Sequence, residues 1–155
     1  MRSILLAALG VALVLAPAWG QSAPATDDTT IDSILTQKAI TFGNAAWLVG
    51  RSAGTYDEKV TPEQATGLAR SAGWVGKDKK DNDAVDLQSY GLILLKAFDL
   101  PTGLVYGWLP GPRYALRELT FRKILPSNLA PDDLVSGEEA MRYLQAAQDW
   151  KEAKR

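Results

Sequence analysis

One local pattern recurs along the chain: an aliphatic residue, a residue that caps helices, and then apolar positions at helical spacing. It occurs at Ile40-Thr41, Val60-Thr61, Val85-Asp86 and Val135-Ser136. At the last of these, Ser136 can cap a helix and Glu139 can complete a reciprocal capping box. At the second, Pro62 takes the first helical position, where its missing amide hydrogen costs nothing. The pattern therefore predicts four helix starts.

Periodicity alone predicts two further helices, over residues 30–37 and 113–123. In the second of them Leu116, Leu119 and Ile124 can share one face. The chain also resembles itself, because a shift of fifty residues aligns residues 73–75 with residues 123–125. We therefore predict an all-α fold of six short helices, arranged as three helix-loop-helix pseudo-repeats packed in one domain.

Two segments are similar to a known exported module. Residues 68–75 (LARSAGWV) form a predicted helix with a Gly-Trp-Val corner, and residues 135–140 (VSGEEA) open another helix. They resemble the first helix and the second helix opening of the S-layer homology repeat, a module that usually occurs in threes. Residues 60–65 (VTPEQA) are similar to the same opening, but they begin a predicted first helix. The resemblance implies three packed helical units within residues 31–155 and, by analogy, a protein held at the cell envelope.

The chain departs from this family at one functional position. The family's helix openings carry an arginine that contacts negatively charged wall polymers. Phe42, Leu87 and Gly137 occupy that position here. The resemblance therefore does not transfer the family's polymer-binding site to these three residues.

The first twenty residues have the three parts of a cleavable signal peptide. Arg2 supplies positive charge, residues 4–15 are apolar, and small residues precede a cut between Gly20 and Gln21. A cut after Ala23 and a retained membrane anchor are the alternatives. The apolar run has twelve residues, whereas a helix that spans a bilayer needs about 20. We expect a periplasmic or secreted protein with no integral membrane span after signal removal.

Composition narrows the class of the exported product. Residues 21–30 are small and polar and predict a flexible tether, which leaves 31–155 as the folded domain. The formal net charge is −1, and removal of Arg2 with the signal makes it −2. Proteins that bind nucleic acid are strongly basic, so we expect no nucleic-acid partner.

Few kinds of catalytic or metal-binding site are possible in this chain, because it contains no histidine and no cysteine. Serine and cysteine triads, histidine proton shuttles and zinc sites built on those ligands are excluded, and so is a lipoprotein signal. The acidic run at 78–83 lacks the glycine and glutamate of a helix-loop-helix calcium site. We predict a solvated loop there, and neither a metal nor a cofactor.

The most unusual stretch is 100–114, where three prolines and three glycines surround aromatic residues. This density argues against a regular helix and predicts a loop or short turns. If Tyr106 and Trp108 are exposed, they can stack on sugar rings or dock a partner, with Arg113 and Arg117 available for an anionic group. The alternative is that these aromatic residues fold into the core.

These observations favour an exported, non-catalytic cell-envelope protein. Its predicted partner is a wall glycan or another envelope protein, bound through Tyr106, Trp108, Arg113 and Arg117. A glycan hydrolase that uses two carboxylates is an alternative. Its candidates, Glu63, Glu118, Glu138 and Glu139, take positions that helix capping or solvation already explains. A purely structural assembly partner is the third possibility.

Overall fold

The computed structural model describes residues 27–108 and 110–154, and within them the protein is all-helical. The helices are α1 (Asp27–Leu35), α2 (Phe42–Ser52), α3 (Pro62–Ser71), α4 (Leu87–Ala97), α5 (Leu104–Trp108), α6 (Pro112–Phe121) and α7 (Gly137–Glu152). The described residues form seven helices, so the prediction of six helices was wrong by one. The predicted signal peptide, the cut between Gly20 and Gln21, and residues 21–26 lie outside the described residues.

The additional helix, α5, lies in the stretch rich in proline and glycine. Its five residues make little more than one turn, between Gly103 and Pro110. Proline and glycine limit the length of a helix, but a single turn fits between them. The prediction of a loop or short turns without a regular helix was therefore wrong at residues 104–108.

The four capped helix starts are confirmed. Helices α2, α3, α4 and α7 follow Thr41, Thr61, Asp86 and Ser136 in turn. The Asp86 carboxylate accepts a hydrogen bond from the Ser89 amide at 2.8 Å. At α7 the Glu139 carboxylate accepts from the Ser136 amide at 3.0 Å, which completes the capping box. These starts were predictable because a cap is determined by neighbours within four residues.

The Glu139 cap makes stability depend on pH. Hydrogen bonds from the Ser136 amide and hydroxyl, with the charge of Arg142, lower the pKa of Glu139 below its ordinary value of 4.5. A lowered pKa stabilises the folded state above the unfolded pKa, and this contribution is lost as the pH falls through the folded pKa. We expect Glu139→Gln to cost about 0.5 kcal/mol at pH 7. Urea unfolding should show the deficit shrinking below pH 4.5, and a deficit that stays constant down to pH 3 would contradict the assignment.

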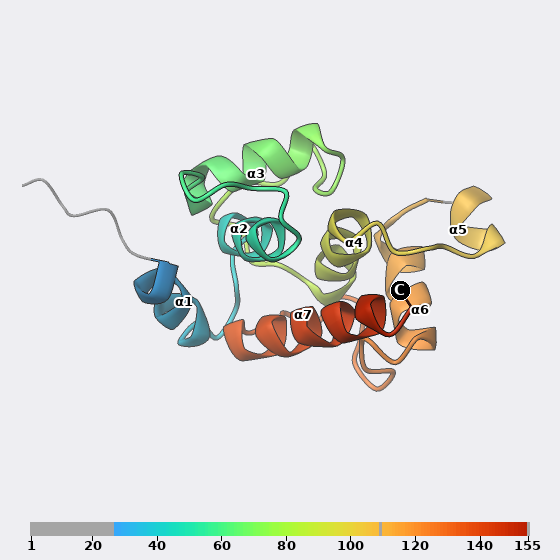
Figure 1. Cartoon of the computed structure of the whole chain (residues 1–155). Helices are drawn as coiled ribbons and strands as arrows, with labels where there is room; N and C mark the ends of the chain where they lie inside the picture. Colours follow the sequence, from blue (N-terminus) through green and yellow to red (C-terminus); the bar gives the residue numbers. More distant parts are fainter. Residues whose placement is uncertain (1–26, 109, 155) are drawn as a thin grey trace, which may run out of the picture.

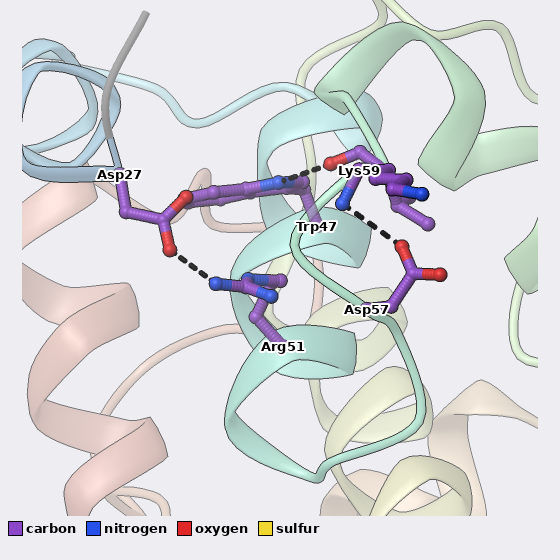
Figure 2. A network of polar contacts seen from close by, with 6 residues as sticks. Asp27, Trp47, Arg51, Asp57 and Lys59 are labelled. Atoms are coloured by element: carbon purple, nitrogen blue, oxygen red, sulfur yellow. Dashed lines mark hydrogen bonds and ion pairs between the residues drawn. The ribbon is translucent and has the colours of Figure 1, made fainter.

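Helix α1 begins three residues earlier than predicted, inside the stretch assigned to the tether. Its first turn carries Asp27 and Asp28, which are favourable at the positive end of a helix dipole. Figure 2 shows the Asp27 carboxylate paired with the Arg51 guanidinium of α2. Beside them the Trp47 indole donates to the Val60 carbonyl at 2.8 Å. A tertiary partner 24 residues away thus orders acidic residues that look like part of a tether in the sequence.

The helices pack around α2 and α4, which lie in the middle of the molecule (Figure 1). Helix α3 packs on α2, and α6 packs on α4 at the opposite side. Helix α7 contacts both α1 and α4. Figure 1 also shows α5 projecting from the body of the protein beside α6. Trp47 and Trp74 are buried in the core.

Three aliphatic residues form a closed ring of backbone hydrogen bonds at the centre of the fold. The Ile40 amide donates to the Val135 carbonyl at 2.7 Å, the Val135 amide to the Val85 carbonyl at 3.0 Å, and the Val85 amide to the Ile40 carbonyl at 2.9 Å. All three side chains are buried. Each residue directly precedes a helix cap, so the ring brings together the starts of α2, α4 and α7.

A second set of hydrogen bonds surrounds this ring. The amides of the first helical residues, Phe42, Leu87 and Gly137, donate to the carbonyls of Asp83, Asp133 and Gln37 at 2.9 to 3.0 Å. These bonds satisfy amides at helix starts that have no partner within their own helix. The side chains of Phe42 and Leu87 are buried, and a Cβ on Gly137 would lie 1.8 Å from the Ile34 carbonyl oxygen. None of the three positions has room for an arginine that reaches a ligand.

Candidate functional site

The most distinctive surface of the described residues lies between α5 and α6. One stripe of α6 faces α5, with residues spaced by three, four and seven positions, as neighbours on a helix face are. Together with residues of the α5 segment it lines a cavity of about 290 Å³. The lining residues are Gly103, Tyr106, Tyr114, Arg117, Glu118 and Phe121. We call this the α5–α6 cavity.

Glu118 on α6 and Arg122 directly after α6 bind the backbone of residues 101–103, just before α5. The Glu118 carboxylate accepts a hydrogen bond from the Gly103 amide at 3.2 Å and pairs with the Arg122 guanidinium at 3.3 Å. Arg122 also donates to the Pro101 carbonyl and stacks over the ring of Trp150, 5.1 Å from its centroid. Both charged side chains are mostly shielded from solvent. The backbone before α5 is therefore held against α6, and the charge of Glu118 is balanced by the Arg122 guanidinium.

Tyr106 is the most deeply buried aromatic residue of the projecting segment, with 6% of its surface exposed. Its hydroxyl group has no hydrogen-bond partner among the described residues. Burial raises the pKa of this hydroxyl, so the group stays protonated at neutral pH and remains a donor. The Lys96 ammonium lies 6.0 Å from the ring centroid. A buried hydroxyl without a partner is uncommon and costly, because it has lost its bonds to water.

Three large apolar side chains of α5 and α6 are highly exposed. Leu104, Trp108 and Phe121 expose 86%, 85% and 87% of their surface. Phe121 lines the cavity, whereas Leu104 and Trp108 lie four positions apart on α5 and share its other face. Single exposed apolar residues are normal on protein surfaces, but adjacent ones such as Leu104 and Trp108 mark a candidate interaction surface.

The four predicted site residues separate into two groups. Tyr106 and Arg117 line the cavity, whereas Trp108 and Arg113 are exposed outside it. Of the two predicted aromatic residues, one is therefore buried and the other exposed. Arg113 and Arg117 make no ion pair within the part of the chain that the structure describes.

Three residues of this site, Tyr114, Glu118 and Phe121, were not predicted to belong to it. Tyr114 and Phe121 lie seven residues apart, off the face that carries the buried Leu116 and Leu119. This second apolar stripe on α6 was the available signal, since a helix with one core face needs only one stripe.

Cavities also occur elsewhere among the described residues, and two of them bear on the candidate carboxylates. The larger, of about 740 Å³, lies between the 123–129 segment and α7, and Glu139 is its one carboxylate. The smaller, of about 160 Å³, also has a single carboxylate, Glu152. The α5–α6 cavity has Glu118 alone. No group of acidic side chains within residues 27–108 and 110–154 is arranged to hold a metal ion, and none of their helices is long and apolar enough to cross a membrane.

Comparisons with models of protein families, with curated proteins and with solved structures find no match to this chain. The similarity to the S-layer homology repeat therefore stays a prediction. What the protein binds has to be inferred from its own residues.

Proposed function

We propose that the fold consists of three pseudo-repeats, formed by α1–α2, α3–α4 and α6–α7. The closed ring of Ile40, Val85 and Val135 supports this arrangement, because each residue takes the same place before a helix cap. The loops that precede two of these residues also match. The Lys80 amide donates to the Asp83 carboxylate at 2.8 Å, and fifty positions later the Ala130 amide donates to the Asp133 carboxylate at 2.7 Å.

The helix ends give further support for the pseudo-repeats. Gly73 and Lys123, aligned by the fifty-residue shift, both have left-handed backbones, with φ of 74° and 60°. The residue after each of them returns to the core through a hydrogen bond to a helix carbonyl. Lys123 is a residue that rarely takes this conformation, so the surrounding structure imposes it. Helix α5 is then an insertion between the second and third units.

We propose that the protein is an exported, non-catalytic component of the cell envelope that binds wall glycan through the α5–α6 surface. This surface comprises the α5–α6 cavity and the exposed residues Leu104, Trp108, Arg113 and Phe121. The observation that carries the proposal is a cavity lined by aromatic side chains and by Arg117, which makes no ion pair with any described residue. Sugar sites commonly combine aromatic faces with a few polar groups that fix orientation.

Two observations bear on the alternatives. A two-carboxylate hydrolase needs a pair of acids about 5 to 10 Å apart, whereas the α5–α6 cavity is lined by one carboxylate, Glu118. The exposed trio Leu104, Trp108 and Phe121 favours an envelope protein as the second candidate partner. Apolar and aromatic residues of this kind form the centres of protein interfaces.

Co-sedimentation with purified cell-wall sacculi tests the proposed function. Residues 21–155 should bind saturably, and binding should weaken as salt is added, because the α5–α6 surface is cationic. Trp108→Ala should lower the affinity about tenfold. Leu68→Ala is the matched control, since Leu68 is also an exposed leucine but lies on α3. Absence of binding at every salt concentration would refute the wall-glycan proposal and leave a protein partner.

A further inference from the structure

One face of α5 is apolar and largely open to solvent. Leu104 and Trp108 expose 86% and 85% of their surface, whereas Tyr106, two positions from each of them, is buried. Residues two positions apart point to roughly opposite sides of a helix. The Tyr106 side of α5 is therefore turned toward the body of the protein, and Leu104 and Trp108 are turned away from it. We call the side that carries these two residues the α5 outer face.

Contacts at the base of α5 hold this face in position. The Glu118 carboxylate accepts a hydrogen bond from the Gly103 amide, and the Arg122 guanidinium donates to the Pro101 carbonyl. Both bonds tie the backbone directly before α5 to the α6 segment. Figure 1 shows α5 beyond the other helices, beside α6. The α5 outer face is thus presented on a projection whose start is fixed.

The projecting segment is uncharged and offers few side chains for hydrogen bonds. Residues 100–112 include no charged residue, and their two hydroxyl groups belong to Thr102 and Tyr106. On the α5 outer face the one side-chain donor is the Trp108 indole NH. An interface between proteins has about one hydrogen bond per 100–200 Å². The α5 outer face therefore suits an apolar environment better than a hydrogen-bonded protein partner.

Cationic side chains lie at the base of the projection. Arg117 lines the α5–α6 cavity, and the Lys96 ammonium lies 6.0 Å from the centroid of the Tyr106 ring. Neither of these cations, nor the exposed Arg113, makes an ion pair with any described residue. Residues 96–122 contain four cations and two acids, so this part of the chain has a net charge of +2. An apolar projection with cations at its base is complementary to a membrane surface, where negative headgroups cover an apolar interior.

We propose that the α5 outer face inserts into the surface of a lipid bilayer that contains anionic lipids. Leu104 and Trp108 enter the boundary between headgroups and acyl chains, and the cations at the base of α5 contact headgroup phosphates. Insertion is shallow, because the irregular backbone on both sides of α5 has to keep its hydrogen bonds to water. Tryptophan favours this depth, since its ring is apolar and its indole NH is polar. This inference goes beyond the proposed function and does not rest on it.

Co-sedimentation with lipid vesicles tests the proposal. The protein comprises residues 21–155, which include every described residue and exclude the apolar run at 4–15. Vesicles of phosphatidylcholine alone are compared with an equal mixture of phosphatidylcholine and phosphatidylglycerol. We expect binding to the mixture to be at least about ten times tighter and to weaken as salt is added, because each cation near an anionic surface contributes.

Leu104→Ser provides the decisive variant. It removes an exposed apolar side chain, so binding to the mixed vesicles should fall about tenfold. The melting temperature should stay the same, because Leu104 is almost fully exposed. Leu68→Ser is the matched control, since it replaces an exposed leucine on α3 and should leave binding unchanged. Arg113→Gln should weaken binding to the mixture about fivefold and leave binding to phosphatidylcholine unchanged.

Tryptophan fluorescence reports which residue enters the lipid. Trp47 and Trp74 are buried, whereas Trp108 is exposed. Lipids with brominated acyl chains quench a tryptophan that inserts between them. We expect quenching in the parent chain and its loss in Trp108→Phe, which keeps an apolar ring and therefore most of the binding. Quenching that persists in Trp108→Phe would show that another part of the protein enters the bilayer, and would overturn the proposal.

The outcomes separate this inference from the proposed function, because purified sacculi contain no bilayer. A leucine side chain has no ring to stack on a sugar, so Leu104→Ser should weaken binding to vesicles and leave binding to sacculi unchanged. If neither kind of vesicle is bound, the lipid inference is wrong and an envelope protein is the remaining partner for the α5 outer face. It is also wrong if Leu104→Ser binds vesicles as the parent chain does. Failure to bind sacculi refutes the wall-glycan proposal alone.

Discussion

Gly137→Ala should lower the free energy of unfolding by about 3 kcal/mol, at the upper end of what overpacking costs. The new Cβ would lie 1.8 Å from the Ile34 carbonyl oxygen and 3.1 Å from the Leu35 Cα. Both are backbone atoms, so no side chain can rotate to make room. Either the end of α1 or the start of α7 has to move, and the hydrogen bond from the Gly137 amide to the Gln37 carbonyl would be strained.

Gly67→Ala is the matched control for this prediction. Gly67 lies in the middle of α3, is exposed, and would place its Cβ in open space. Alanine is a better helix former than glycine, so this variant should gain up to about 1 kcal/mol. Urea unfolding followed by circular dichroism measures both variants. Equal stability of Gly137→Ala and the parent chain would show that α1 does not pack on α7 as described.

Tyr90→Ala should cost about 4 kcal/mol, as large truncations in a core do. The Tyr90 side chain is completely buried, and its hydroxyl donates to the Ala140 carbonyl at 2.7 Å. The residue therefore links α4 to α7 through both packing and a hydrogen bond. Burial raises the pKa of Tyr90 far above its usual range, so the hydroxyl remains a donor under all ordinary conditions.

Tyr90→Phe separates these two contributions. It keeps the ring and removes the hydroxyl, and it should cost about 1 kcal/mol. Thermal and urea unfolding of both variants give the comparison. If the phenylalanine variant were as unstable as the alanine variant, the hydrogen bond and not the packing of the ring would dominate at this position.

The helix starts were predictable because capping is local. Thr41, Thr61, Asp86 and Ser136 were identified from neighbours within four residues, and each lies directly before a helix. The start of α1 was missed, since Asp27 is stabilised by Arg51 in another helix. The start of α6 was placed one residue late, at Arg113 in place of Pro112. Helix boundaries that depend on tertiary contacts cannot be predicted from the local sequence.

The candidate site was predictable only in part. Composition drew attention to the stretch around Tyr106 and Trp108, and Arg117, which was predicted to bind an anionic group, lines the α5–α6 cavity. No local rule tells which of two aromatic residues two positions apart is buried, because that depends on which face of α5 turns toward α6. The same holds for Tyr114 and Phe121, whose role becomes visible only when α5 lies beside them.

The fold also explains why Phe42, Leu87 and Gly137 stand at positions where the S-layer homology repeat has an arginine. These residues surround the central ring, where the starts of α2, α4 and α7 meet. Two of them fill the core, and the third has to be glycine because the Ile34 carbonyl occupies the space of a side chain. These three positions are therefore closed to a ligand, whereas the surface around α5 and α6 is exposed.

The central ring also determines how the protein can fold. Ile40, Val85 and Val135 are separated by 45 and 50 residues, so the ring closes only when the last fifth of the chain is present. An open solenoid gains stability one repeat at a time and tolerates the loss of an end. Here each of the three residues bonds to both others, so the starts of α2, α4 and α7 belong to one cooperative unit. The ring cannot close until Val135 has been synthesised, so the cooperative unit forms late in synthesis.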